Sequence, residues 1–308
     1  MSSETFIPEE FRKKYSGLAG SESAEFFEAC ATKIPKSIWM NSLKIRPEIL
    51  ARDLRKKGWK IERLFHENAY SVGGIDRPGQ SEEFKRGLFN LQEKAAMIPA
   101  IALGAGKRDT ALDATAAPGN KTLQMACIMN GAGKIIAVEK NVERFRSMKL
   151  NAQKWGLKNA VLKRMDLLDA RRKSVFEKIL LDAPCSSEGF MRKDFDALRN
   201  WNMELVMRKA QLQKKLMEKC LEMLKPEGIL VYSTCTFAPE ENEEVVQEII
   251  KGGKAELMAV KIPGFKIRAG LTEYNGKKFD SSMEKAARIW PQDNDTQQFF
   301  LAKIRKTG

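Results

Sequence analysis

From residue 107 onward, short apolar runs alternate with longer helix-like segments, and this alternation restricts the fold more than any other feature. The expected strands cover residues 109–116, 134–140, 159–166, 176–185, 229–236 and 297–306. Helices are expected to begin at Lys121 and to cover residues 142–156, 203–224 and 240–252. Strands that alternate with helices form a mostly parallel sheet with helices on both faces. The sequence therefore predicts an α/β fold with one large sheet.

The first 95 residues differ from this pattern. They begin with short helix-like stretches and continue with an expected strand at 36–44, a helix at 46–58 and an extended segment at 59–72. We therefore expect two domains, a small α+β domain over residues 1–95 and a sheet domain over residues 96–308.

Four aromatic side chains are scattered through the basic N-terminal part. Aromatic rings among positive charges can stack on nucleotides, but at this density they more often build a core. We therefore expect Trp39, Trp59, Phe65 and Tyr70 to lie in the core of the small domain.

The charge balance favours a polyanionic partner. Lys and Arg outnumber Asp and Glu by 54 to 40, which gives a formal net charge of +14. Nucleic acid is the most direct explanation, although a generally basic surface would give the same count. No apolar run is long enough to cross a bilayer, and the start lacks the apolar core of a signal peptide. We expect a cytoplasmic protein with no membrane span.

The histidine and cysteine content limits the available chemistry. The cysteines stand at positions 30, 127, 185, 220 and 235. They form no Cys-x-x-Cys pair, and His66 is the only histidine, so we expect no metal site. Cys30, Cys127 and Cys220 lie on the apolar sides of expected helices and should be core residues. His66 is expected in a loop or on the surface.

The segment DATAAPGNKT, after the first expected strand, has the composition of a ligand-binding loop. Gly119 and its small neighbours let backbone approach a ligand closely, and the following helix offers its N-terminal amides. The loop matches neither Walker A nor Gly-x-Gly-x-x-Gly. Glu139 and Asp166 end the next two strands, where acids can hold ribose hydroxyls and an adenine amino group. A nucleoside cofactor without a polyphosphate fits, and S-adenosylmethionine is the common one.

Three segments resemble motifs of the Nop/Sun family of RNA cytosine-5 methyltransferases. DATAAPGNKT is similar to the cofactor motif, DAPCSSEG to the proline-cysteine motif and YSTCTFAPEENE to the threonine-cysteine motif. The resemblance extends over residues 36–305 and is to the tRNA-modifying, archaeal-like type. It implies a Rossmann-like class I methyltransferase sheet with S-adenosylmethionine as cofactor. We expect the N-terminal domain to bind RNA.

The reaction of this family explains the need for two thiols. Cytosine C5 is a poor nucleophile until a thiolate adds to C6, and the chemistry alone leaves open which thiol attacks. The resemblance implies that Cys235 is the nucleophile and that Cys185 assists proton removal from C5 and product release. It also implies that Asp182 contacts the cytosine and that Lys121 points into the pocket, where its charge lowers a thiol pKa or holds the base.

The expected cofactor-binding residues are Thr115, Ala116, Ala117, Pro118, Gly119, Asn120, Lys121, Glu139, Arg144, Asp166 and Asp182. Some positions depart from the family pattern. Asn120 replaces a glycine, and asparagine tolerates left-handed backbone better than most residues. Ser187 stands where the family often has glycine, and Gln297 and Gln298 replace a glycine pair.

The resemblance implies tRNA as the substrate, because small family members with a short N-terminal extension and no recognisable appended RNA-binding module tend to act on tRNA. Ribosomal RNA is the alternative substrate, and we expect a monomer. A non-catalytic RNA-binding assembly factor is a second alternative, but the intact cysteines, Asp182 and Lys121 argue against it. A DNA cytosine methyltransferase is disfavoured, since such enzymes use the proline-cysteine thiol and carry a separate target-recognition region.

Overall fold

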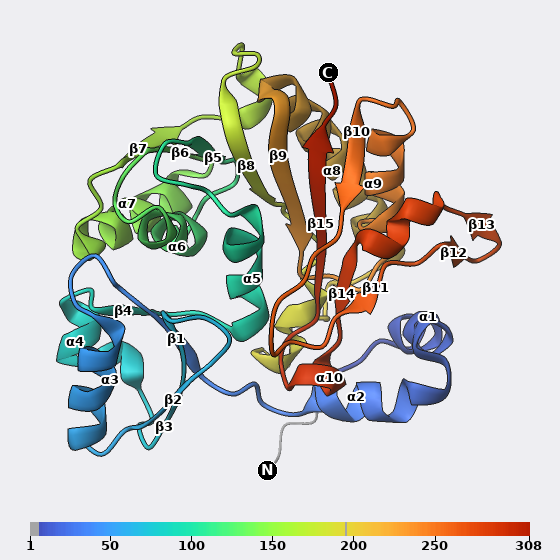
Figure 1. Cartoon of the computed structure of the whole chain (residues 1–308). Helices are drawn as coiled ribbons and strands as arrows, with labels where there is room; N and C mark the ends of the chain where they lie inside the picture. Colours follow the sequence, from blue (N-terminus) through green and yellow to red (C-terminus); the bar gives the residue numbers. More distant parts are fainter. Residues whose placement is uncertain (1–5, 195) are drawn as a thin grey trace.

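The computed structural model describes residues 6–194 and 196–308 and confirms the predicted α/β architecture (Figure 1). The strands of its large sheet follow the order β7 (Ala160–Arg164), β6 (Lys134–Glu139), β5 (Thr110–Asp113), β8 (Phe176–Asp182), β9 (Leu224–Thr234), β15 (Phe299–Lys306), β14 (Ala287–Ile289) and β11 (Arg268–Ala269). β10 (Ala255–Met258) pairs with β15. Neighbouring strands are parallel from β7 across β6, β5 and β8 to β9, whereas β15 runs antiparallel to β9.

The strand order reverses beside β5. β6 and β7 continue outward from one edge of β5, whereas β8 and β9 lie beyond its other edge. Such a reversal leaves a crevice outside the carboxyl ends of the two central strands, where ligands bind in open α/β sheets. The loops that follow β5, β8 and β9 therefore converge on one place.

Helices cover both faces of the sheet because side chains alternate between the faces along each strand. On β8, Ile179 and Leu181 belong to the core with α8 (Met203–Met223) and α9 (Glu243–Ile250). Leu180 points to the other face and packs with α5 (Lys94–Leu103) and α6 (Asn120–Ile128). The next helix along the chain is α7 (Val142–Trp155).

An antiparallel sheet lies in the N-terminal part, apart from the large sheet (Figure 1). Its order is β2 (Lys60–Arg63), β3 (Ala69–Gly73), β1 (Ser37–Met40) and β4 (Phe89–Leu91), with α3 (Pro47–Lys56) and α4 (Glu82–Lys85) beside it. The expected extended segment 59–72 contains two strands rather than one. A turn separates them, in which Leu64 N–H donates to the carbonyl of Ala69 at 2.8 Å.

The aromatic residues of the small sheet are largely buried, as expected. Trp59 and Tyr70 lie in its core with α3. Trp39 is only 1% exposed but faces the larger part of the molecule. Phe65 is half-buried. His66 lies in a loop, as expected, and its ring stacks on Trp39 with the ring centroids 4.7 Å apart.

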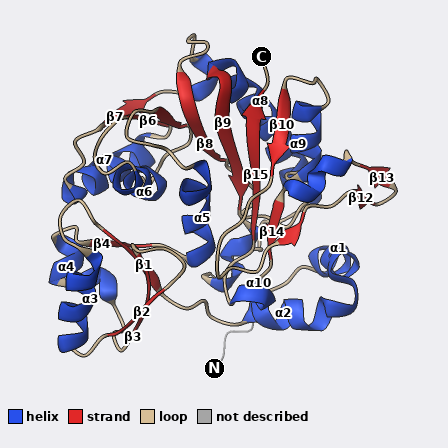
Figure 2. Ribbon diagram, in the orientation of Figure 1, coloured by secondary structure: helices blue, strands red, loops and turns tan. Residues whose placement is uncertain are grey.

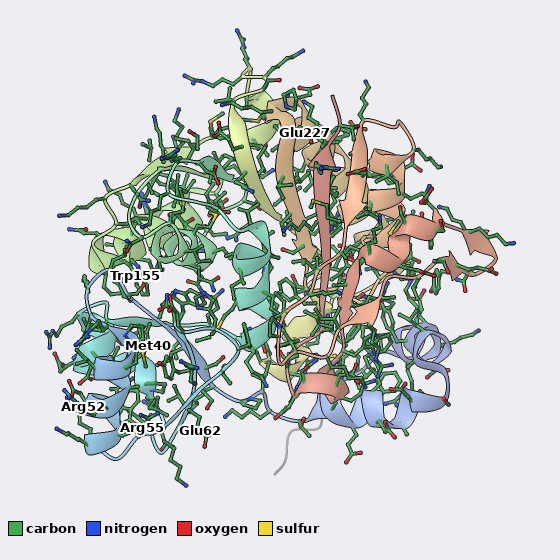
Figure 3. All side chains as sticks on the ribbon, in the orientation of Figure 1. Met40, Arg52, Arg55, Glu62, Trp155 and Glu227 are labelled. Carbon is green, nitrogen blue, oxygen red and sulfur yellow. The ribbon has the colours of Figure 1, made fainter. Side chains whose placement is uncertain are left out.

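The small sheet is fixed to the large one by an apolar contact around Trp155, at the end of α7. Trp155 is 1% exposed and packs with Trp39, Met97 and Leu123. The side-chain amide of Asn41 donates to the carbonyl of Trp155 at 3.0 Å. Trp155 lies between α7 and the small sheet, whereas Arg52 of α3 points away from this contact (Figure 3).

Helices α1 (Glu9–Ala19) and α2 (Ser23–Ala31) do not cover the small sheet. They lie on the opposite side of the molecule, beside α10 (Pro291–Asn294) and near the hairpin of β12 (Glu273–Tyr274) and β13 (Lys277–Lys278) (Figure 2). Phe11 and Phe26 pack there with residues of the larger part. The domain boundary near residue 95 stays a prediction, and residues 1–5 of the expected first domain lie outside the described residues.

We expect Trp155→Ala to lower the free energy of unfolding by about 3 to 5 kcal/mol, because it leaves a large cavity between the two sheets. Leu150→Ala on the same helix is the control, since Leu150 is 66% exposed and should change stability by only about 0.5 kcal/mol. Denaturant unfolding followed by circular dichroism measures both. Equal midpoints for the two variants would contradict the packing role of Trp155.

Candidate active site

A cavity of about 870 Å³ opens at the crevice beside β5 and β8. Residues from the loops after β5, β6, β8 and β9 line it, together with Lys36 and Arg77 of the N-terminal part. A volume of this size suits a small-molecule ligand, since such sites span about 300 to 1,000 Å³. The cavity is therefore bounded by both sheets.

The expected cofactor loop forms one wall of this cavity. Thr115, Ala116, Ala117, Pro118, Asn120 and Lys121 all line it, whereas Gly119 does not. Gly119 shapes the turn instead, with a φ of +105°, and an added Cβ would lie 3.3 Å from Met148 Cγ. Asn120 does not need the left-handed backbone conformation that we considered for it. It is the first residue of α6, and Gly119 takes the left-handed position. The amide oxygen of Asn120 accepts a hydrogen bond from Asn90 at 2.6 Å.

The acids at the next two strand ends also line the cavity. The Glu139 carboxylate accepts from the Asn141 N–H at 2.8 Å and lies 3.5 Å from Arg144. Arg144 also donates to the carbonyl of Ala117 at 2.6 Å, which ties α7 to the cofactor loop. Asp166 is an N-cap that accepts from the Leu168 N–H at 3.1 Å. Each acid keeps hydrogen-bonding capacity for a ligand.

Asp113 is a cavity residue that sequence reasoning missed, although it is the first residue of the cofactor motif. It is 1% exposed, and burial raises its pKa to about 7. One carboxyl oxygen accepts from Thr122 at 2.6 Å, and the other has no partner among the described residues. A buried acceptor without a donor fits the amino group of an S-adenosylmethionine molecule, so the residues present suit this cofactor.

The two thiols predicted to act together are in contact. β8 and β9 are neighbours, and the sulfur atoms of Cys185 and Cys235 lie 3.2 Å apart. A hydrogen bond to Cys235, burial and the charge of Cys235 raise the pKa of the Cys185 thiol well above its ordinary value. Cys235 is the more exposed of the pair. The two thiols therefore differ in both exposure and environment.

Asp182 and Lys121, which both line the cavity, form an ion pair. Lys121 Nζ lies 2.6 Å from one carboxylate oxygen of Asp182, and Ser233 donates to the other oxygen at 2.8 Å. The carbonyl of Asp182 accepts from Thr115 at 2.8 Å. The pairing register places Asp182 directly opposite Ser233, so the same strand pair positions this carboxylate and the thiols.

Two buried glutamates connect the cysteine loops reciprocally. Glu241, from the loop after Cys235, accepts from the Ser186 N–H at 3.0 Å, next to Cys185. Glu188, from the loop after Cys185, accepts from the Phe237 N–H at 2.8 Å, two residues beyond Cys235. Both glutamates are fully buried. Their positions within the two cysteine motifs are the only sequence signal, and their roles depend on the folded arrangement.

Neither a metal cluster nor a membrane-spanning helix is found in the described parts of the chain. Across residues 6–194 and 196–308, no three His, Cys, Asp or Glu residues come together as a metal site. In the same residues, no helix has the length and apolar character needed to cross a bilayer.

Comparison with known families decides the relationship. Residues 100–305 match the family described as 16S rRNA methyltransferase RsmB/F, and residues 7–94 match the N-terminal domain of 16S rRNA methyltransferase RsmF. The chain belongs to the RsmB/F family. The predicted relationship to the Nop/Sun enzymes is confirmed, and with it S-adenosylmethionine as cofactor and RNA cytosine methylation as the activity of the family.

Two curated relatives differ in substrate and in length. The tRNA (cytosine(49)-C(5))-methyltransferase of Pyrococcus abyssi is 38% identical, with 97% of this chain and 98% of the relative covered. The ribosomal RNA small subunit methyltransferase F of Vibrio atlanticus is 35% identical over 99% of this chain. This RsmB/F protein spans only 65% of the length of the Vibrio relative.

Two solved structures share the whole fold. A methyltransferase homologue from Pyrococcus horikoshii superimposes with a TM-score of 0.87 at 33% identity, covering 97% of this chain and 95% of its own. NSun6 from the same organism, solved with the S-adenosylmethionine analogue SFG, gives 0.85 at 25% identity and covers 99% of both chains.

Burial is the main cause that raises the pKa of the Glu241 carboxyl to about 9, and the charge of Glu188 contributes to the shift. Between pH 4.5 and about pH 9, the Glu241 carboxyl is therefore protonated in the folded protein. In the unfolded chain the same carboxyl has its ordinary pKa of 4.5 and is ionised. The stability contributed by the proton is present below about pH 4.5 and is lost as pH rises toward 9. We expect wild type to lose about 2 to 3 kcal/mol between pH 6 and pH 8 that Glu241→Gln does not lose.

Denaturant unfolding at pH 6 and pH 8 measures this difference. Glu248→Gln is the matched control, because Glu248 is exposed at the surface of α9 and its variant should follow wild type. Parallel pH profiles for wild type and Glu241→Gln would show that the buried carboxyl does not hold the proton.

Proposed function

We propose that this RsmB/F protein transfers a methyl group to C5 of a cytosine in tRNA through a covalent bond between Cys235 and cytosine C6. The observation that carries this proposal is the contact of 3.2 Å between the Cys185 and Cys235 sulfurs at the wall of the cavity. Two thiols in contact beside an ion-paired carboxylate supply both a nucleophile and a proton-handling group.

The two thiols have different environments, which supports different roles. Cys235 is the more exposed and can reach a base in the cavity. In the proposed reaction its thiolate adds to C6 of the target cytosine, and the electron pair of the C5–C6 bond becomes available at C5. S-adenosylmethionine, when bound, supplies the methyl group that C5 receives.

Cys185 and the ion pair complete the reaction. After methylation, Cys185 assists removal of the proton from C5, and the electrons of that C–H bond restore the ring double bond while the Cys235–C6 bond breaks. Asp182, held by Lys121 and Ser233, contacts the polar edge of the cytosine. Thr115, Glu139, Arg144 and Asp166 would hold the cofactor along the adjoining wall.

Similarity to a tRNA-modifying relative over nearly its whole length supports tRNA as the substrate. The Pyrococcus tRNA enzyme is 38% identical, with 97% of this chain and 98% of that enzyme covered. Ribosomal RNA remains the second candidate, because the Vibrio ribosomal RNA enzyme is 35% identical over 99% of this chain. We also infer that the N-terminal domain of residues 1–95 contacts RNA through α3, whose exposed Arg52, Arg55 and Lys56 give that surface a positive charge. A monomer in the cytoplasm stays our prediction.

We expect Cys185→Ala to accumulate a covalent protein–RNA adduct and to lower turnover by about 10²- to 10⁴-fold, because proton handling is lost after the bond has formed. Cys235→Ala should form no adduct and transfer no methyl group. Denaturing gels with labelled tRNA and S-adenosylmethionine measure both. Cys220→Ala is the control, as Cys220 is a core residue outside the cavity. The opposite adduct pattern would exchange the roles of the two thiols.

We expect the wild-type protein to label bulk tRNA rather than 16S rRNA when labelled S-adenosylmethionine is supplied. Sequencing of bisulfite-treated product RNA then identifies the 5-methylcytosine. Label found only in 16S rRNA would favour the second substrate, and label in neither RNA would favour a non-catalytic RNA-binding role.

A further inference from the structure

Phe190 is a large apolar side chain that stands exposed at the catalytic cavity. It is 43% exposed, and it lines the same cavity as Cys185 and Cys235. A single exposed aromatic residue on a protein surface is ordinary. One that lines the reaction cavity of an RNA-modifying protein is positioned to meet the RNA.

The turn that carries Phe190 is rigidly attached at its beginning. This turn is a short 3₁₀ helix over Glu188–Arg192. The buried Glu188 carboxylate accepts from the hydroxyl of Tyr15 at 2.6 Å and from the indole of Trp201 at 2.7 Å. The next residue, Gly189, donates its N–H to the carbonyl of Cys235 at 2.8 Å. The turn is therefore fixed relative to the reactive sulfur.

The end of the turn is anchored equally well. Arg192 is 2% exposed, and its guanidinium donates to the carbonyl of Thr296 at 2.7 Å and to Asp295 at 2.6 Å. It also donates to the carbonyl of Thr32 at 3.0 Å. With both ends held by buried polar groups, the middle of the turn presents Phe190 outward in a fixed position.

Positively charged side chains line the cavity together with the exposed ring of Phe190. Lys193 Nζ lies 5.0 Å from the centroid of the Phe190 ring, and both residues line the cavity. Lys209, Lys36 and Arg77 line it as well. Aromatic rings next to cationic side chains are the combination that binds single-stranded nucleic acid, through base stacking and phosphate contacts.

We propose that Phe190 stacks on the base next to the target cytosine, and that Lys193 contacts the phosphate between them. The proposal rests on the proposed function. A thiol can reach cytosine C6 only when the base has left its stack, and this leaves the neighbouring base without a partner. A ring fixed beside the thiols replaces the lost partner and stabilises the extruded arrangement.

The test uses an RNA fragment that carries the methylated cytosine identified in wild-type product. Phe190→Ala should raise the KM for this RNA about 5- to 100-fold, the range expected for one stacked base. Phe190→Trp, which keeps an aromatic ring, should stay within about twofold of wild type. The dissociation constant for S-adenosylmethionine, measured by equilibrium dialysis, should be unchanged in both variants and reports that they fold.

Phe6→Ala is the matched control. Phe6 is also exposed, at 48%, and also lies beneath a cation, with Arg199 5.9 Å from its ring centroid. It does not line the cavity. Phe6→Ala should leave the KM for RNA at the wild-type value. A raised KM in Phe190→Ala alone would then show that the effect comes from the position of Phe190 at the cavity and not from the loss of any exposed phenylalanine.

A second experiment removes the base on which Phe190 is proposed to stack. Fragments with an abasic site on the 5′ or the 3′ side of the target cytosine are compared with intact RNA. One of them should weaken binding to wild type about as much as Phe190→Ala does, and should not weaken the variant further. The proposal would be overturned if the abasic site weakened RNA binding by the same factor in Phe190→Ala as in wild type. An unchanged KM in Phe190→Ala would also overturn it, and in both cases methylation by wild type would still stand. Failure of wild type to methylate any RNA would instead remove the proposed function.

Discussion

The site depends on two buried glutamates, each of which accepts a hydrogen bond from the backbone of the other cysteine loop. Glu241 holds the backbone beside Cys185, and Glu188 holds the backbone beside Cys235. Each loop is thereby positioned by a residue of the other loop. Strand pairing brings the two loops near each other. The hydrogen bonds between the loops then fix their relative positions, so that the two sulfurs are in contact. Substitution of either glutamate should therefore disturb both thiols.

In our proposal, the cofactor and the RNA contact different residues of one cavity. The cofactor loop and the acids at the ends of β6 and β7 form a wall suited to a nucleoside. Phe190, Lys193 and Lys209 also line the cavity, and Lys36 and Arg77 of the N-terminal part add positive charge to it. The thiols and the Lys121–Asp182 pair lie in the same cavity, where the two ligands must meet.

Much of this arrangement could be predicted from the sequence, because alternation fixes the sheet and motif order fixes which loops converge. The adjacency of Cys185 and Cys235 follows from their positions after neighbouring strands. Other features had no local signal. Glu188 and Glu241 belong to the cysteine motifs, but their burial depends on partners far along the chain, such as Tyr15 for Glu188. The packing of α1 against residues near Trp201 is likewise a long-range contact that no local pattern encodes.

The contact between Tyr15 and Glu188 joins residues 173 positions apart, and the bond between Thr296 and Glu93 joins residues 203 apart. Contacts of such separation form slowly, because a long loop must close before they contribute to stability. The small sheet, in contrast, is built from segments that are near neighbours in sequence. During refolding, the small sheet should therefore form early, and the thiol pocket should be the last region of the molecule to reach its working geometry.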